Sequence, residues 1–147
     1  MFRFKLQSVL DYRLSLEEKA IREFSELTQS LEEKKNVLQE LVARRGILIG
    51  DLRRSSGALC RAEDIAECVA YVERIRMQEK RTLEEIRQGE EALDEKRREL
   101  AEAVKNRKVI EKMREKQERE YYSDLNTREQ KHADELSVLK HGRRRGR

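Results

Sequence analysis

Proline is absent from this chain of 147 residues, and glycine occurs only six times. Because proline and glycine are the residues that most often break helices and form turns, the chain has few places where a helix would end. Charged residues make up 44% of the sequence and aromatic residues 5%, which leaves little material for a globular core. The sequence therefore predicts long helices, and a function that depends on surfaces and partners rather than on a catalytic pocket.

The charge distribution favours ordered helix over disorder. The 34 basic and 30 acidic residues leave a net charge of only +4, whereas disordered chains usually carry a large net charge. The two signs are interleaved along the body of the chain, as on the solvated faces of coiled coils. The positive excess lies at the end, where residues 140–147 contain no acid and a basic tail is formed by Lys140, Arg143, Arg144, Arg145 and Arg147.

Apolar residues form a heptad-like seam in two segments. The steps along it mostly alternate between three and four residues, which keeps one stripe facing a partner helix. In the first segment the seam consists of Leu6, Val9, Arg13, Leu16, Ala20, Phe24, Leu27, Leu31, Lys34, Leu38, Leu41, Arg45, Leu48 and Leu52. In the second segment we place it at Ile65, Val69, Val72, Arg76, Glu79, Leu83, Ile86, Glu90, Leu93, Arg97, Leu100, Val104, Ile110, Met113, Tyr121, Leu125, Leu136 and Leu139.

Small residues around Gly57 mark a bend between the two segments. We predict one all-α unit, a two-helix antiparallel coiled-coil hairpin with unequal arms. Its first helix covers about residues 5–54, its bend about 55–61, its second helix about 62–140, and its basic tail 141–147. If pairing starts at the bend, residues beyond about 112 have no partner within the chain. Gly46 and Gly50, four residues apart, either let another helix approach closely or only loosen the first helix.

The sequence contains no motif for chemistry. A phosphate-binding loop, a dinucleotide-binding glycine motif, HExxH and GxSxG are all missing. His132 and His141 are nine residues apart, so they do not share a helical face on which to hold a metal. Cys60 and Cys68 form no CxxC motif and are expected to be free structural thiols. We therefore expect no catalytic residue, no cofactor, no metal and no small-molecule substrate.

The two ends of the sequence bear on location. The start has no apolar run of the kind a signal peptide needs, and no stretch is long enough to span a membrane. We therefore expect the protein in the cytosol, or at most on a membrane surface. The basic tail could contact nucleic acid, but basic-zipper proteins carry their basic region before the coil. A solubilising tail, or one attracted to anionic lipid, fits its position at least as well.

Two stretches carry a resemblance to a known family. Residues 2–13, FRFKLQSVLDYR, alternate aromatic and basic residues and then give a Leu-x-x-Val-Leu step and an arginine. This opening resembles that of flagellar export proteins of the FliJ type. Residues 128–136, REQKHADEL, resemble the closing EQK-x-x-DE segment of that family, and the central Tyr71-Val72 also fits. The resemblance covers essentially the whole chain.

The resemblance implies a hairpin similar to the rotor stalk of rotary ATPases. Such a protein is a non-enzymatic part of the bacterial flagellar type III export apparatus, cytoplasmic and peripheral at the inner membrane. The implied partners are a hexameric export ATPase, the cytoplasmic domain of the export gate, and export chaperones. For the gate, the family's apolar and aromatic contact positions near the bend correspond best to Leu41, Leu48, Tyr71 and Ile75.

For the ATPase, exposed aromatic residues near the open end are the natural candidates, because aromatics dominate interface energetics. We predict contacts from Phe2, Phe4, Tyr121 and Tyr122; alternatively, Phe4 and Tyr121 simply pack on each other. Two other functions stay open at this stage. One is the equivalent stalk of a virulence type III injectisome, and the other is a generic coiled-coil scaffold with a nucleic-acid- or membrane-binding tail.

Overall fold

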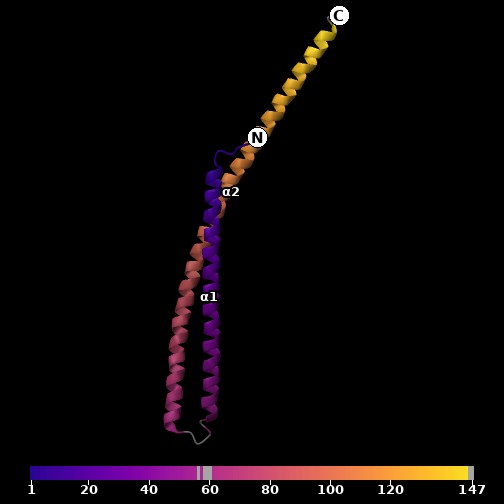
Figure 1. Cartoon of the computed structure of the whole chain (residues 1–147). Coiled ribbons are helices and arrows are strands. Elements are labelled where there is room, and N and C mark those ends of the chain that lie inside the picture. Colours follow the sequence, from indigo (N-terminus) through magenta and orange to yellow (C-terminus); the bar gives the residue numbers. More distant parts are fainter. Residues whose placement is uncertain (56, 58–60, 146–147) are drawn as a thin grey trace. The chain divides into compact units, whose positions relative to one another are not determined.

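Two helices make up almost all of the described chain. The structure, a computed structural model, describes residues 1–55, 57 and 61–145, with side chains described as far as residue 141. Helix α1 covers Gln7–Ser55 and helix α2 covers Ala62–Arg145 (Figure 1). Their lengths, 49 and 84 residues, give the hairpin unequal arms. The prediction of an all-α hairpin of two helices that pack against each other is confirmed.

The helix ends differ slightly from those expected. Helix α1 begins at Gln7 rather than near residue 5, after a turn in which the Gln7 amide donates to the Phe4 carbonyl at 3.3 Å. The backbone of α2 continues beyond residue 140 as far as Arg145, so much of the predicted basic tail is helical. Arginine is a good helix former, and no proline is present to stop the helix.

Charges at the bend match the helix dipoles. Arg53 and Arg54 occupy the last turn of α1, and Glu63 and Asp64 the first turn of α2. Cations near a helix C-terminus and anions near an N-terminus are each stabilising by roughly 0.3–1 kcal/mol. Residues 56 and 58–60 of the predicted bend, Cys60 included, lie outside the described residues.

The chain divides into two compact units, and each helix contributes to both. We call residues Lys19–Ala101 the central unit. The terminal unit combines Met1–Glu18 with Glu102–Arg147.

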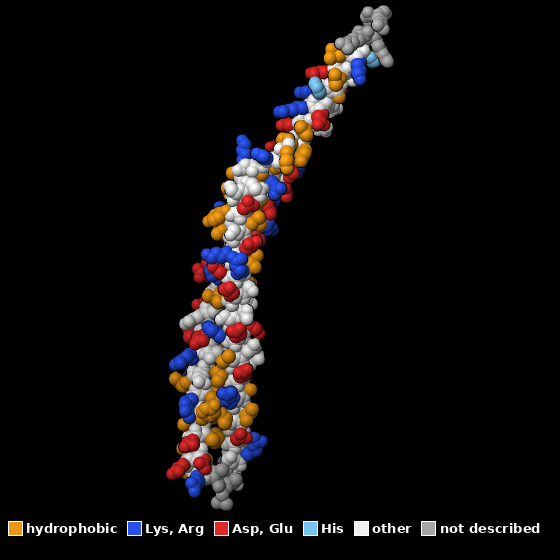
Figure 2. Space-filling view, viewed as in Figure 1, with side chains coloured by type: hydrophobic (Ala, Val, Ile, Leu, Met, Phe, Trp, Pro, Cys, Tyr) orange, Lys and Arg blue, Asp and Glu red, His pale blue; other side chains and the backbone are white. Residues whose placement is uncertain are grey.

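In the central unit the two helices lie side by side and run in opposite directions (Figure 1). Ion pairs between the helices show the direction: the partner of Glu23 is Lys96, and the partner of Arg45 is Glu79. Residue numbers on α2 thus fall as those on α1 rise. Further pairs join Lys34 to Glu85 and Lys35 to Glu90. Lys, Arg, Asp and Glu side chains are interleaved over the visible surface (Figure 2), as the charge distribution predicts.

Every predicted seam position of the first segment, from Leu6 to Leu52, is buried or half-buried. On α2, one of the two rows of the seam was predicted one residue too late within the central unit. The residues that face α1 are Cys68, Ile75, Thr82, Gly89 and Lys96, whereas the predicted positions Val69, Arg76, Leu83, Glu90 and Arg97 are exposed. The other row was predicted correctly: its members are buried or half-buried, namely Ile65, Val72, Glu79, Ile86 and Leu93. Each residue of the corrected row lies three residues after one member of this row and four residues before the next.

The reason for the shifted row is steric. Leu31 of α1 is only 5% exposed, and a Cβ atom added at Gly89 would lie 2.9 Å from its Cδ1 atom. Glycine therefore gives the Leu31 side chain room between the helices. A Cβ at Gly46 would meet no atom within 4 Å, and one at Gly50 only the Arg54 side chain at 3.9 Å. The close approach of helices is thus at Gly89, not at Gly46 and Gly50.

The core of the terminal unit is small. Phe4, which is 9% exposed, and Leu10 are its buried apolar side chains. Arg107 of α2 pairs with Glu17 of α1 and with Glu111 on its own helix, and the Arg107 and Glu17 side chains are largely buried. Because a guanidinium with two carboxylate partners keeps its hydrogen bonds when it leaves water, the pair fixes the two helices at this level.

Candidate functional site

Aromatic residues gather where the N-terminal segment meets α2 in the terminal unit. The rings of Phe2 and Tyr121 lie 5.7 Å apart between centroids, and those of Tyr121 and Tyr122 lie 5.4 Å apart edge to face. The Met1 ammonium group donates a hydrogen bond to the Tyr121 hydroxyl at 3.1 Å. The structure thus brings together three of the four residues predicted to contact the ATPase. We call Met1, Phe2, Tyr121 and Tyr122 the aromatic cluster.

Phe4, the fourth of those residues, has a different environment. It is buried, and the ring that contacts Tyr121 is that of Phe2. Sequence reasoning missed which residue of the segment Met1–Leu6 would meet Tyr121, because the seam pattern describes only helical residues. This segment also moves the start of the unpaired part of α2, expected near residue 112, to a point beyond Tyr121.

Beyond the aromatic cluster, α2 has no partner among the described residues. All side chains from Tyr122 to His141 are exposed. Apolar side chains are included in this segment, namely Leu125, Leu136, Val138 and Leu139, with Tyr122 itself 54% exposed. We call residues 122–141 the free segment. Exposed apolar groups that recur along a helix with no partner are typical of a surface that binds another protein.

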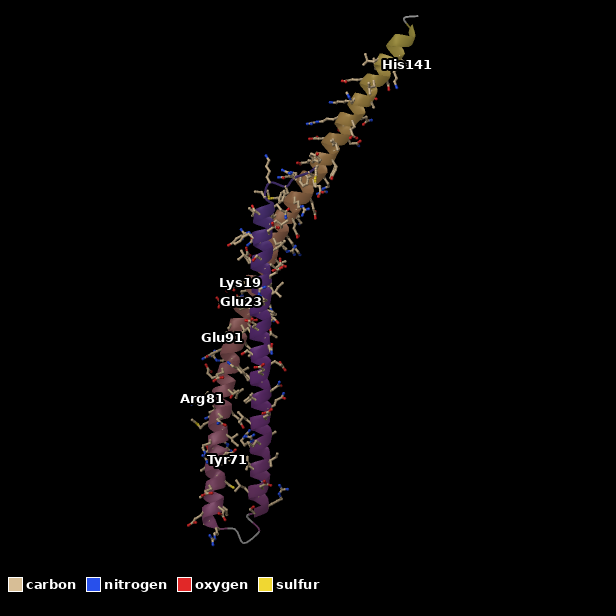
Figure 3. The ribbon with its side chains drawn as sticks, viewed as in Figure 1. Lys19, Glu23, Tyr71, Arg81, Glu91 and His141 are labelled. Atoms are coloured by element: carbon tan, nitrogen blue, oxygen red, sulfur yellow. The ribbon has the colours of Figure 1, made fainter. Side chains whose placement is uncertain are left out.

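The four gate candidates fall into two groups in the central unit. Ile75 is 2% exposed, the lowest value among the described side chains, and Leu41 and Leu48 are half-buried on the seam. These three therefore contribute to the packing of the hairpin. Tyr71 is 38% exposed (Figure 3), and the Arg74 guanidinium carbon lies 5.5 Å from the centre of its ring.

Val69 and Met77 are also exposed apolar residues of α2, which sequence reasoning did not single out as contacts. They are two and six residues from Tyr71, so they lie on other sides of the helix. Val69 was assigned to the seam, and a seam residue is normally hidden. Had the row been placed at Cys68 and Ile75, Val69 would have stood out as an exposed apolar residue.

The perturbed ionisable groups are parts of ion pairs. Lys96 contacts Glu23 at 3.0 Å and Glu99 at 2.8 Å. The hydrogen bond and charge of Lys96 lower the pKa of Glu23, and the hydrogen bonds to Glu99 and Glu23 raise the pKa of Lys96. On α2 alone, the Arg87 hydrogen bond lowers the pKa of Glu84. Each shift favours the charged form, which suits a structural role rather than proton transfer.

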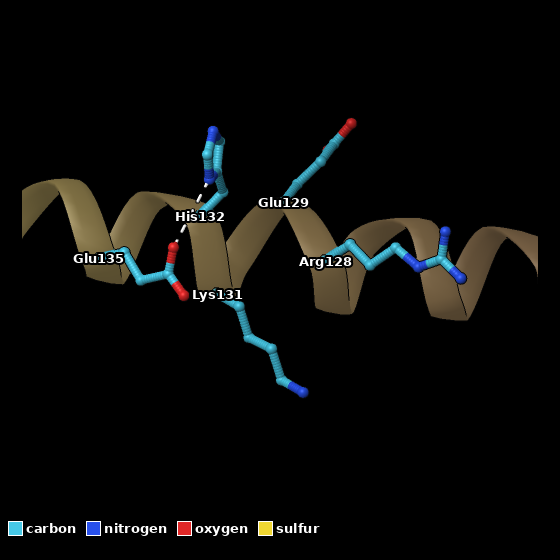
Figure 4. Close-up of a pocket in the computed structure, with 5 residues that line it drawn as sticks. All are labelled: Arg128, Glu129, Lys131, His132 and Glu135. Carbon is cyan, nitrogen blue, oxygen red and sulfur yellow. Dashed lines mark ion pairs between the residues drawn. The ribbon is translucent and has the colours of Figure 1, made fainter.

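The described surface of α2 includes two hollows that are each lined by this helix alone. One is lined by Glu115, Glu118, Arg119 and Tyr122, and the other by Arg128, Glu129, Lys131, His132 and Glu135 (Figure 4). In the second hollow, the His132 Nδ1 atom lies 3.8 Å from a Glu135 carboxylate oxygen. Because a single helix lines each hollow, neither surrounds a small ligand in the way that an enzyme site does.

The remaining sequence predictions concern single residues. Cys68 is a half-buried free thiol, and Cys60 lies outside the described residues. Arg143, Arg144 and Arg145 belong to the helical end of α2 without described side chains, and Arg147 lies outside the described residues. Within the described part of the chain, no group of three or more His, Cys, Asp or Glu side chains could hold a metal ion. Nor does any helix there have an apolar stretch fit to cross a bilayer.

These features define a class of protein, an antiparallel two-helix coiled coil whose second helix carries exposed apolar side chains with no partner among the described residues. Comparison with protein families identifies the class more closely: the family model described as the flagellar FliJ protein matches residues 2–146. The chain belongs to the FliJ family, whose members are non-enzymatic components associated with flagellar protein export. Searches of curated proteins and of solved structures found no match.

Proposed function

We propose that the protein is a stalk that links the hexameric flagellar export ATPase to the cytoplasmic domain of the export gate and to export chaperones. The observation that carries this proposal is the free segment of α2, which follows the aromatic cluster and has no partner within the described chain. A helix that extends beyond its hairpin partner has the form needed to enter the opening of a ring. We place the protein at the cytoplasmic face of the inner membrane.

The aromatic cluster and the free segment form the proposed ATPase surface. Aromatic anchors, Tyr among them, are enriched at the energetic hot spots of protein interfaces. Phe2 and Tyr122 are the cluster members that we expect to contact the ATPase directly. Tyr121 already engages the Met1 ammonium group and the Phe2 ring, so we assign it the role of holding the cluster in place.

Tyr71 and the Arg74 guanidinium beside its ring form the proposed gate surface. It belongs to the central unit, whereas the aromatic cluster belongs to the terminal unit. A partner bound at one surface therefore shares no side chain with a partner bound at the other. Export chaperones are the third proposed class of partner. The basic residues at the end of α2 are proposed to strengthen attachment to anionic lipid, where each adds about 1 kcal/mol.

Stimulation of the export ATPase tests the first surface. We expect Phe2→Ala with Tyr122→Ala to raise the concentration needed for half-maximal stimulation by about tenfold or more, because losing a hot-spot aromatic costs at least about 1–2 kcal/mol. Tyr12→Ala is the matched control, because Tyr12 is an exposed tyrosine of the same unit that lies on α1, away from the cluster. Unchanged stimulation by the double variant would count against the ATPase surface.

Pulldown with the cytoplasmic domain of the gate tests the second surface. Tyr71→Ala should weaken gate binding while leaving the thermal melt and the ATPase stimulation unchanged, since Tyr71 is exposed. Val72→Ala is the contrasting control: Val72 is buried, and its truncation should lower stability by about 1–3 kcal/mol through lost burial. A Tyr71→Ala variant that melts early and still binds the gate normally would place Tyr71 in the core and refute its assignment. Swimming motility of cells that carry each variant then reports the combined function.

A further inference from the structure

The free segment carries a complete heptad row on one face. Its members are Tyr122, Leu125, Glu129, His132, Leu136 and Leu139, separated by steps of three, four, three, four and three residues. All six side chains are exposed. Glu129 and His132 point to the same side of the helix, and Lys131 points to the opposite side (Figure 4). This is the spacing that lets one helix pack along another.

The pattern of apolar and polar residues in this row is the same from either end: two apolar, two polar, two apolar. Two apolar residues are followed by an acid and a histidine, and then by two more apolar residues. When a second copy of the segment runs antiparallel, one register places Tyr122 opposite Leu139, Leu125 opposite Leu136, and Glu129 opposite His132. Because the arrangement has a two-fold axis, each pairing occurs twice, which gives four apolar layers around two polar ones.

The positions that flank this row are complementary as well. In an antiparallel coil, residues at heptad position g, directly before position a, face the g positions of the other helix. In this row Glu129 and Leu136 occupy a positions. The residues directly before them are Arg128 and Glu135, so Arg128 of each copy faces Glu135 of the other. Both side chains line the same hollow as Glu129 and His132 (Figure 4). The charges on this face therefore match those of a second copy rather than repel them.

Other arrangements of two copies are less favourable. A parallel pair in register places Glu129 beside Glu129 and His132 beside His132, and it leaves Arg128 facing Ala133. A shift of the antiparallel pair by one heptad sets Leu125 against Glu129, or His132 against Leu136, so that apolar side chains meet polar ones. Of these arrangements, only the antiparallel register that pairs Glu129 with His132 sets apolar residues against apolar residues and the acid against the histidine along the whole row.

We propose that the free segment of α2 is a homotypic docking site, which binds the same segment of a second copy of this chain in antiparallel orientation. The buried surface is short and Arg119 faces Lys140 at its margin, so the association is weak and reversible, with a dissociation constant of roughly 10–100 µM. Any partner that covers the free segment competes with it. The proposal does not rest on the stalk function, since it concerns the isolated chain alone.

Sedimentation equilibrium of the full chain, with charge-reversal variants, tests the proposal. Arg128→Glu sets two acids against each other twice in the homodimer, and Glu135→Arg does the same with two bases. Each variant alone should self-associate at least about tenfold more weakly, since two attractive pairs become two repulsive ones. An equimolar mixture of the two variants should recover dimer of wild-type affinity, because every facing pair then has opposite charges.

Matched controls are available on the same segment. Lys131→Glu and Asp134→Arg make equivalent charge changes at exposed positions away from the row, and each should dimerise like the natural chain. All substitutions lie outside the hairpin core, so far-UV circular dichroism should be unchanged throughout. A natural chain that stays monomeric at about 1 mM, about ten times the upper end of the expected constant, overturns the proposal. Variants that dimerise normally on their own, or a mixture that shows no recovery, overturn it too.

Discussion

Substitution of Gly89 by alanine tests the packing of the central unit most directly. At an ordinary exposed site within a helix, Gly→Ala stabilises by about 0.5–1 kcal/mol, because alanine loses less backbone entropy. At Gly89 the new Cβ would lie 2.9 Å from the Leu31 Cδ1 atom, well inside the roughly 3.5–4.0 Å of a favourable carbon–carbon contact. Leu31 is buried and has little free space to retreat into.

The two effects oppose each other, and their magnitudes decide the sign. Overpacking of a well-filled core costs about 1–3 kcal/mol, which exceeds the helix-propensity gain. We therefore expect Gly89→Ala to destabilise the central unit by roughly 0–2 kcal/mol. Gly46→Ala is the matched control in the same unit, because a Cβ there meets no atom within 4 Å. That variant should be stabilised by about 0.5–1 kcal/mol.

A double-mutant cycle separates the steric effect from the propensity effect. Leu31→Ala alone should cost about 2–5 kcal/mol through lost burial and the cavity it leaves. In that background the clash is absent, so Gly89→Ala should now stabilise, and the coupling between the two positions should reach about 1–3 kcal/mol. Urea unfolding followed by far-UV circular dichroism measures all four proteins. Equal stabilisation by Gly89→Ala and Gly46→Ala, with no coupling to Leu31, would refute the close approach.

Two ion pairs give further predictions. Because Lys96 lowers the pKa of Glu23 below its ordinary value of 4.5, Glu23 contributes stability above pH 4.5 and loses it as the pH falls through the lowered pKa. Lys96→Met should therefore reduce the acid-side dependence of the unfolding free energy, measured by urea titration between about pH 2 and pH 6. Glu79→Ala leaves the half-buried Arg45 without its 2.7 Å partner and should cost about 1.5–3 kcal/mol. Asp94→Ala, which breaks the exposed pair with Arg97, should change the free energy of unfolding by less than about 1 kcal/mol.

The sequence predicted the fold class and one seam because those depend on local patterns. Helix α1 has a leucine or another large apolar residue at most seam positions, so a single choice of stripe fits it. In α2, one row holds Val72, Ile86, Leu93 and Leu100, and it was placed correctly. The other row could begin at Cys68 or at Val69, and hydrophobicity alone favoured Val69 and Leu83 over Cys68 and Thr82. The choice depends on how much room Leu31 and its neighbours need, which is a property of the paired helices.

The aromatic cluster was only partly predictable for a related reason. Tyr121 and Tyr122 are conspicuous on a charged helix, and the antiparallel layout places the start of the chain near them. Which aromatic residue of the opening meets Tyr121 depends on a non-helical segment, for which seam periodicity gives no guide. The sequence favoured Phe4, but the structure buries Phe4 and sets the Phe2 ring against Tyr121. Helical periodicity thus identifies which face of a helix is buried, whereas the contacts of a non-helical segment become known only from the structure.

The composition of α2 explains how one helix can serve both as hairpin partner and as docking surface. Where α2 is paired, small or charged residues such as Gly89 and Lys96 occupy one row, and ion pairs with α1 help to set the register. Where α2 is free, the apolar row is interrupted by Glu129 and His132, so that no continuous apolar stripe faces water. An unbroken row would favour irreversible aggregation. An interrupted row gives weaker contacts that form and separate, and this is the behaviour required of a surface that exchanges one partner for another.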